Sequence, residues 1–151
     1  EKAPADRLVI PSDVIPVNAT DETIQIVGTR GEKVTKIDGL EGCTELRNLI
    51  LRACLISRIE GIEHLHKLEK LELYDNQLLA ISCVSTLHNL TTLDLSFNCI
   101  RSMAPVKDCP QLEELYIAQN KLRKIEGLEG LTKLRVLDLG ANRIRVRSLV
   151  L

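Results

Sequence analysis

The chain has 151 residues, of which 44% are hydrophobic and 27% are charged, and its formal net charge is −1. This balance gives no reason to expect bulk attraction to nucleic acid or to an anionic membrane. No apolar run approaches the ~18 residues that a membrane-spanning helix needs. Aromatic residues make up only 2% of the chain, so the core of the single expected domain must be built mainly from leucine and isoleucine.

The N-terminal part of the chain, residues 1–23, contains Pro4, Pro11 and Pro16 and lacks the periodicity of the rest. We expect it to form a flexible lead or a partial N-terminal cap. Its first residues do not have the pattern of a secretory signal peptide.

From residue 24 to residue 151 the chain is organised by an internal repeat. The pattern Leu-x-x-Leu-x-Leu-x-x-Asn returns at a constant interval of 22 residues, and its five recognisable copies begin at Leu46, Leu68, Leu90, Leu112 and Leu134. One degenerate copy in the same register precedes them, beginning at Ile24. A fixed interval over so many residues does not arise by chance.

The positions within each copy predict its structure. The Leu-x-Leu segment alternates as a short β-strand does. The apolar positions that follow come every third residue, which favours short 3-10 turns over an α-helix. A single copy cannot bury its own leucines, whereas stacked copies share one core. The pattern is the leucine-rich repeat signature. It predicts a right-handed α/β solenoid with a parallel sheet on the concave face and short 3-10 or loop segments on the convex face.

The asparagine that closes each pattern has a structural explanation. The chain turns inward after each strand and leaves backbone groups without partners, which an amide side chain can satisfy. Asn76, Asn98, Asn120 and Asn142 are therefore expected to form a buried ladder, with Cys54 in the equivalent position of the first full copy.

The cysteines indicate a reducing environment. They number five, and no two are spaced as Cys-x-x-Cys. Cys43 and Cys109 stand where other copies have leucine and are expected to be small buried hydrophobic residues. An intracellular location, nuclear or cytoplasmic, is the simpler expectation.

No catalytic, cofactor or metal site is expected. The sequence contains no phosphate-binding glycine loop, no Gly-x-Ser-x-Gly and no His-Glu-x-x-His. Gly39, Gly61 and Gly127 recur in register and are expected to be turn glycines. His64 and His66 have no convergent partners in the sequence. We therefore expect a protein that is not an enzyme.

The outward positions of the strands are the candidate binding site. Glu72, Asp94, Tyr116 and Asp138 fall in one row across the expected sheet, and Tyr74 lies in the next. Phe97 lies just beyond, and it is either exposed or tucked against the next repeat. Exposed aromatic residues among polar groups are typical of protein-binding surfaces, and the acidic row favours a partner with basic residues.

A second surface is basic. It comprises Lys121, Arg123, Lys124, Arg143, Arg145 and Arg147, along the edge that follows the asparagines. Such a cluster is more often a solvated face than a site for nucleic acid or an acidic protein, so nucleic acid is not expected as a partner.

Within the repeat class, the chain resembles the regulatory subunit 7 family of protein phosphatase type 1. The resemblance rests on the uniform 22-residue repeat, the Ile-Glu-Gly-Leu turn, and the order of segments such as Leu93-Asp-Leu-Ser-Phe-Asn98 and Leu139-Gly-Ala-Asn-Arg-Ile-Arg145. It covers about residues 34–146. It implies a non-catalytic scaffold that binds the phosphatase catalytic subunit through acidic and aromatic residues of the concave row. By position, Asp94, Tyr116 and Asp138 match that row, and Glu72 extends it.

The chain departs from that family at its C-terminal end, where the pattern fails after Asn142 and no capping segment follows. We expect a monomer that can associate through the uncapped end. Two other functions stay open from the sequence: a ribonucleoprotein scaffold similar to the spliceosomal A-prime protein, and a cytoskeletal adaptor similar to dynein light chain.

Overall fold

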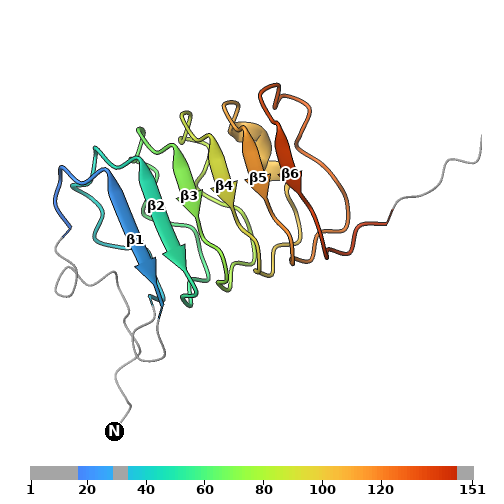
Figure 1. Cartoon of the computed structure of the whole chain (residues 1–151), viewed down its shortest axis with the longest axis horizontal. Helices are drawn as coiled ribbons and strands as arrows, with labels where there is room; N and C mark the ends of the chain where they lie inside the picture. Colours follow the sequence, from blue (N-terminus) through green and yellow to red (C-terminus); the bar gives the residue numbers. More distant parts are fainter. Residues whose placement is uncertain (1–16, 29–33, 146–151) are drawn as a thin grey trace, which may run out of the picture.

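The computed structural model describes residues 17–28 and 34–145. Its main element is one parallel sheet in which six strands follow one another in sequence order (Figure 1). The strands are β1 (Thr23–Val27), β2 (Asn48–Arg52), β3 (Lys70–Glu72), β4 (Thr92–Asp94), β5 (Glu114–Tyr116) and β6 (Val136–Asp138). One 3-10 helix, η1 (Ala104–Asp108), lies between β4 and β5.

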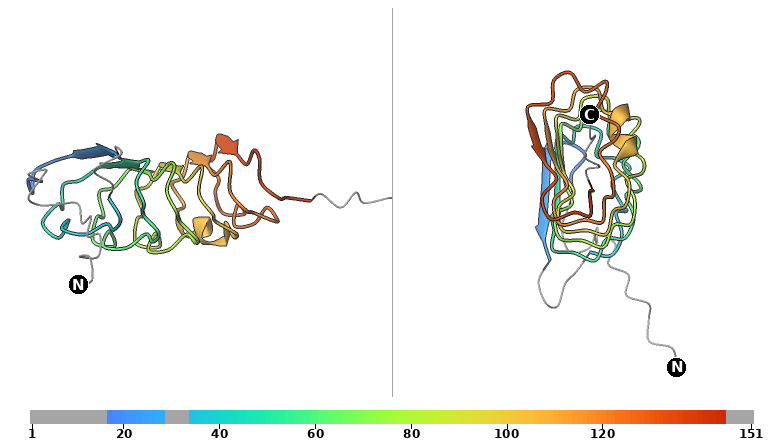
Figure 2. Two further views of the ribbon diagram at one scale, coloured as in Figure 1. Left: turned by 90° about the horizontal axis from the view of Figure 1, so that it is seen from below. Right: turned by 90° about the vertical axis from the view of Figure 1, so that its right-hand side faces the viewer.

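The register of the sheet follows the sequence repeat. Leu49 pairs with Leu71, Leu71 with Leu93, and the same step continues through Leu115 to Leu137. Viewed end-on, the strands line one side of the coil and η1 lies on the opposite side (Figure 2). The expected leucine-rich repeat solenoid with a parallel sheet is therefore confirmed.

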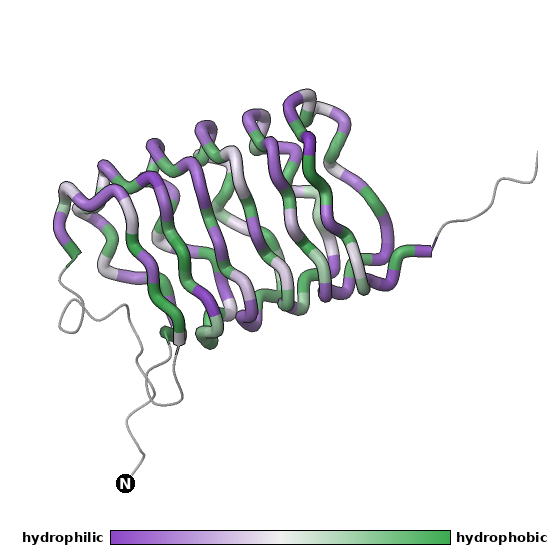
Figure 3. Tube along the Cα trace, viewed as in Figure 1, coloured by the Kyte–Doolittle hydropathy of each residue, from purple (hydrophilic) through white to green (hydrophobic). Residues whose placement is uncertain are grey.

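The core runs the length of the coil and is aliphatic. Leu49, Leu71, Leu93 and Leu115 are each 0% exposed. Apolar and polar segments alternate along every turn of the tube in Figure 3, because each turn sends some side chains inward and others to solvent. Cys43 and Cys109 belong to this core, as expected from the leucines at their equivalent positions.

The return segments keep the period of three through isolated turns. Leu65 N donates to the Ile62 carbonyl at 3.0 Å, and Leu68 N donates to the Leu65 carbonyl at 3.0 Å. Because such bonds come once every three residues, they form successive turns and not a continuous helix. Over residues 17–28 and 34–145, η1 is the one segment that winds into a 3-10 helix.

Pro105 explains the position of η1. The equivalent residues of other repeats are Gly39, Gly61, Cys83 and Gly127, and all of them have positive φ, between 58° and 79°. Proline is held near φ −65° and cannot adopt this conformation. The turn at Pro105 is therefore replaced by the helix.

The asparagine ladder is present. Asn76, Asn98 and Asn120 are 7–8% exposed, and the Nδ2 of each donates to carbonyls of its own repeat and of the preceding one. The ladder continues to the half-buried Asn142. Cys54 stands where the later repeats have asparagine, and its thiol donates to the Arg52 carbonyl at 3.3 Å.

The two ends of the described coil differ from its middle. Leu137 of β6 is 39% exposed, whereas its neighbour Leu115 is 0% exposed. The residues that follow, 146–151, lie outside the described part of the chain, so the expected association through this end stays a prediction. At the other end β1 begins at Thr23, one residue before the expected boundary, and Val17 packs against the core. The expected flexible lead falls mostly on residues 1–16, also outside the described part.

Candidate functional site: the concave face

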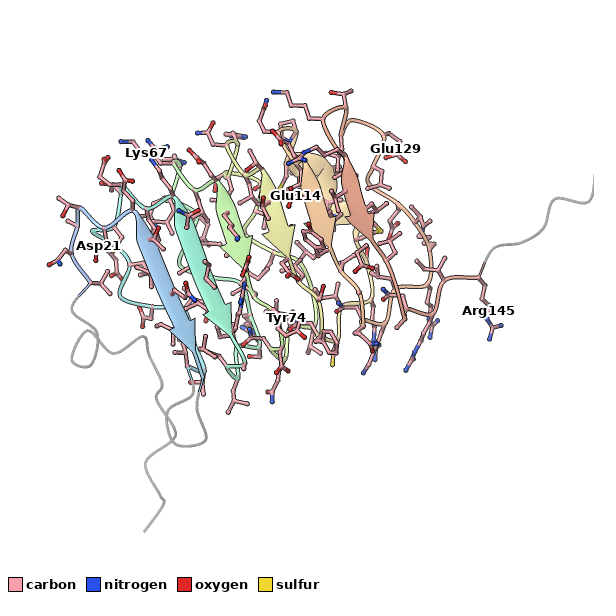
Figure 4. The ribbon with its side chains drawn as sticks, in the orientation of Figure 1. Asp21, Lys67, Tyr74, Glu114, Glu129 and Arg145 are labelled. Carbon is pink, nitrogen blue, oxygen red and sulfur yellow. The ribbon has the colours of Figure 1, made fainter. Side chains whose placement is uncertain are left out.

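The outward face of the sheet, which we call the concave face, carries side chains in three rows. The first row is Asn48, Lys70, Thr92, Glu114 and Val136; the second is Ile50, Glu72, Asp94, Tyr116 and Asp138. The third, just beyond the second, is Arg52, Tyr74, Ser96, Ala118 and Gly140. In Figure 4, Glu114 lies near the start of its strand and Tyr74 lies beyond the end of β3.

Glu72 does not present a free carboxylate, which corrects the expectation of an open acidic row. It is only 6% exposed, because two cations from its own and the preceding strand cover it. Lys70 Nζ lies 2.6 Å from its Oε1, and Arg52 Nε donates to its Oε2 at 2.8 Å. Burial alone would raise the pKa of this carboxyl, but the hydrogen bonds from Lys70 and Arg52 outweigh burial and hold it below its ordinary value. Glu72 is therefore a neutralised part of the surface.

Asp94, Tyr116 and Asp138 form the acidic–tyrosine row. Tyr116 pairs in register with Asp94 on one side and with Asp138 on the other. The Oδ1 atoms of the two aspartates accept backbone N–H groups two residues later, at 2.9 Å in both cases. Among the described residues no cation lies within 4.0 Å of either carboxylate. Two negative charges therefore flank one phenol ring, and each can accept a further hydrogen bond.

The Tyr116 hydroxyl is fixed by a short chain of polar contacts. It donates to Glu114 Oε2 at 3.0 Å, and Arg135 donates to Glu114 Oε1 at 2.8 Å. The hydrogen bond to Glu114 raises the pKa of the phenol, and the nearby Asp94 charge acts in the same direction. The ring is thus held in one orientation, which lowers the entropy that it loses when a partner packs on it.

Tyr74 and Phe97 form the aromatic pair. Their ring centroids lie 5.0 Å apart with an interplanar angle of 50°, and the residues are 36% and 44% exposed. Of the two alternatives for Phe97, the exposed one is therefore correct, with one side of the ring against Tyr74.

The backbone at Phe97 has a conformation that bulky residues rarely adopt. Its φ is +58°, and φ is also positive, between 51° and 57°, at the equivalent positions Ala53, Asp75, Gln119 and Ala141. A large side chain is strained there, and this one adds nothing to the aliphatic core. Neither backbone conformation nor core packing therefore favours a phenylalanine in this position.

A shallow hollow of about 270 Å³ lies on the concave face between the second and third rows. It is lined by Arg52, Tyr74 and Asp94. Tyr74 of the aromatic pair therefore borders the same depression as Asp94, the first carboxylate of the acidic–tyrosine row. The six residues that the sequence singled out lie on or beside one face: Glu72, Tyr74, Asp94, Phe97, Tyr116 and Asp138. Lys70 and Arg135 were not predicted as part of the site, although alternation along each strand places Lys70 in the outward set.

No group of three or more His, Cys, Asp or Glu side chains converges within residues 17–28 and 34–145. In that part of the chain, none of the helices combines the length and the apolar character that crossing a bilayer requires.

The repeat geometry agrees with comparisons to known proteins. The family model described as "Leucine Rich repeats (2 copies)" matches residues 66–108 and 110–149, more than half of the chain. The chain belongs to the leucine-rich repeat family. Proteins of this family are in general interaction scaffolds without catalytic activity, and the present chain has the corresponding architecture. No curated protein matches its sequence.

Several solved leucine-rich repeat structures share the fold. An internalin (InlF) from Listeria monocytogenes has a TM-score of 0.72 and 28% identity over 76% of this chain and 34% of its own. The functional domain of InlJ from the same organism has a TM-score of 0.72 and 23% identity over 87% of this chain and 28% of its own. A leucine-rich repeat protein of Leptospira interrogans has a TM-score of 0.66 and 22% identity over 77% and 37%. The chain spans roughly a third of the length of these structures.

Proposed function

We propose that this leucine-rich repeat chain is a non-catalytic scaffold that holds another protein on its concave face, and that the partner is the catalytic subunit of protein phosphatase type 1. The observation that carries the proposal is the acidic–tyrosine row. Asp94 and Asp138 flank Tyr116 without any cation to neutralise them among the described residues.

The charge of the row defines one part of the partner. One carboxylate lies on each side of the Tyr116 ring. They favour a partner surface that offers arginine or lysine, because charge complementarity steers and orients association. Glu72 is already neutralised by Lys70 and Arg52, so the attraction is concentrated at Asp94 and Asp138.

The aromatic residues define the other part. Tyr74, Phe97 and Tyr116 are the aromatic residues of the whole chain, and all three lie on or beside the concave face. Large, pre-oriented rings are the usual anchors of protein interfaces. An apolar patch bordered by basic groups is therefore the complementary surface.

The phosphatase is proposed because of the family resemblance. In the regulatory subunit 7 family, acidic and aromatic residues of the concave row bind the catalytic subunit, and Asp94, Tyr116 and Asp138 occupy the corresponding places. An intracellular location, nuclear or cytoplasmic, is part of the same proposal. It is supported by the five cysteines, none of which is joined in a disulfide, as suits a reducing compartment.

The proposal is tested by binding the purified phosphatase catalytic subunit to the chain in surface plasmon resonance. The variant Tyr116→Ala combined with Asp138→Ala removes the ring and one charge. Truncation of an interface anchor typically costs ~2 kcal/mol or more, which corresponds to about 30-fold in Kd at each position. We expect the double variant to lose nearly all measurable binding.

The matched control is Asp108→Ala, which removes one carboxylate from η1 on the opposite side of the coil. Its affinity should equal that of the wild type. Absence of binding by the wild-type chain, or equal affinity of the double variant and the control, contradicts the proposal.

A further inference from the structure

The two edges of the coil differ in how their charged side chains are arranged. On the edge before the strands, side chains of successive repeats are paired by opposite charge. Glu45 pairs with Lys67 at 2.6 Å, and Arg47 pairs with Glu69. Farther along, Arg135 pairs with Glu113 at 3.3 Å. We call this the paired edge; in Figure 4 Lys67 lies on it.

On the edge after the strands, the repeats place like charges in register. Arg101, Arg123 and Arg145 are each 22 residues apart, and we call them the arginine column. Lys121 and Arg143 stand beside them with the same interval. In Figure 4 Arg145 lies at the end of the coil on the side away from Lys67.

Backbone contacts bring these segments together. Lys121 N donates to the Ile100 carbonyl at 2.8 Å, and Arg143 N donates to the Leu122 carbonyl at 2.9 Å. The turns that carry the cations therefore run side by side. Arg123, Arg143 and Arg145 together line a hollow of about 450 Å³.

No acid of the described chain forms an ion pair with these five cations. Ion pairs are formed elsewhere, for example between the neighbouring Lys124 and Glu126 at 3.2 Å. Within residues 17–28 and 34–145, none of the five lies within 4.0 Å of a carboxylate. Arg147, which the sequence analysis grouped with these cations, lies outside the described residues.

The contrast shows that the fold does not require this arrangement. Like charges on neighbouring strands or turns are destabilising, whereas opposite charges contribute a few tenths of a kcal/mol. The same solenoid forms opposite pairs along its other edge. A row of unpaired guanidinium groups therefore opposes folding slightly, and a bound anion would relieve the repulsion.

We propose that the arginine column, with Lys121 and Arg143, binds an extended acidic segment of a protein. Three guanidinium groups at about the strand spacing of 4.8 Å span roughly 10 Å. This length suits successive carboxylates of an extended chain, and guanidinium pairs with carboxylate through two parallel hydrogen bonds. The proposal does not depend on which protein occupies the concave face.

The residues around the column favour an acidic peptide over single-stranded nucleic acid. Proteins that bind single strands alternate basic groups with aromatic rings on which bases stack. Where the β4 repeat has Phe97, the next two repeats have Gln119 and Ala141. At this position, next to the column, the repeats that hold most of the positive charge therefore offer no ring to a base.

The test uses fluorescence anisotropy of the whole chain with two labelled probes, a decamer of glutamate and a decamer of uridine. The variant Arg123→Gln with Arg145→Gln is compared with Lys67→Gln with Lys133→Gln. Both double variants remove two positive charges, so they have the same net charge. Lys67 belongs to the paired edge, and Lys133 contacts Gln111 there.

We expect the glutamate decamer to bind the wild type and the lysine variant equally, and to bind the arginine variant at least ~10-fold more weakly. At one fixed concentration, the decamer should also raise the melting temperature of the wild type more than that of the arginine variant. No binding of the glutamate decamer, an equal loss in both double variants, or tighter binding of the uridine decamer overturns the proposal.

Discussion

Replacing Asn98 with alanine tests the account of the asparagine ladder. The side chain accepts the Leu78 N–H at 2.9 Å. Its Nδ2 contacts three carbonyls, those of Leu73 and Leu95 at 3.0 Å and that of Ser96 at 3.2 Å. A simple count of four lost contacts would predict a very large effect.

The structure predicts a smaller one, because the three carbonyls each keep another donor. The Leu73 carbonyl keeps Asn76 Nδ2 at 3.0 Å, and the Leu95 carbonyl keeps Asn120 Nδ2 at 2.9 Å. The Ser96 carbonyl keeps the backbone N–H of Asp75 at 3.0 Å. Only the Leu78 N–H loses its partner altogether. One buried donor without a partner costs about 1–3 kcal/mol, so we expect Asn98→Ala to lower the free energy of unfolding by about 2 kcal/mol.

The assay is urea unfolding followed by far-UV circular dichroism, together with amide hydrogen exchange at Leu78. A loss of this size lowers the melting temperature by about 4–8 °C in a domain of this length. The exchange rate of the Leu78 amide should rise more than those of its neighbours. The control is Asn89→Ala, at an exposed asparagine whose Nδ2 donates to the His66 carbonyl, and it should change stability by less than about 0.5 kcal/mol.

Two results would refute the reasoning. If Asn98→Ala costs no more than Asn89→Ala, the ladder does not stabilise the coil. If it costs more than about 4 kcal/mol, beyond the ~1–3 kcal/mol of a single unsatisfied group, the carbonyls are not held by their second donors.

Three further predictions follow from the site and the core. Phe97→Asn should change stability by less than about 1 kcal/mol, since relief of the positive φ offsets the lost ring contact, yet it should weaken phosphatase binding in plasmon resonance. Burial acts to raise the pKa of Glu72, but the hydrogen bonds from Lys70 and Arg52 outweigh it, so the net shift is downward. The unfolded chain then takes up the proton first, and stability falls as pH drops below the ordinary value of 4.5; in Glu72→Gln the urea midpoint should fall less on acidification. Burial raises the pKa of the Cys109 thiol to about 11, so mass spectrometry should find it unmodified by iodoacetamide in the folded chain at about pH 8 and modified in urea.

The fold was predictable because it depends on position alone. The leucines at a 22-residue interval determine the strand register, and Asn98 is buried because the turn after each strand needs an amide. Pro105 also carried a signal, since it replaces a residue that needs positive φ in other repeats, but the signal appears only when the repeats are aligned on their turn glycines.

The state of the site was less predictable because it depends on pairs of side chains from different strands. Glu72 occupies an outward position, yet Arg52 and Lys70 cover and neutralise it. The contact between Tyr74 and Phe97 joins residues of two repeats. Alternation along a strand tells which way a side chain points, but not whether a neighbour with opposite charge or a ring reaches it.

The ladder also limits how such a protein can change its length. Asn98 bonds the carbonyl of Leu95 in its own repeat and that of Leu73 in the repeat before, and Asn120 bonds Leu95 again. A one-residue insertion between Leu95 and Asn98 would break both connections at once. Insertion of one complete 22-residue unit would place every amide opposite an equivalent carbonyl. The molecule can therefore gain or lose whole repeats by duplication or deletion within its gene, while the strand-to-turn segment itself tolerates no change in length.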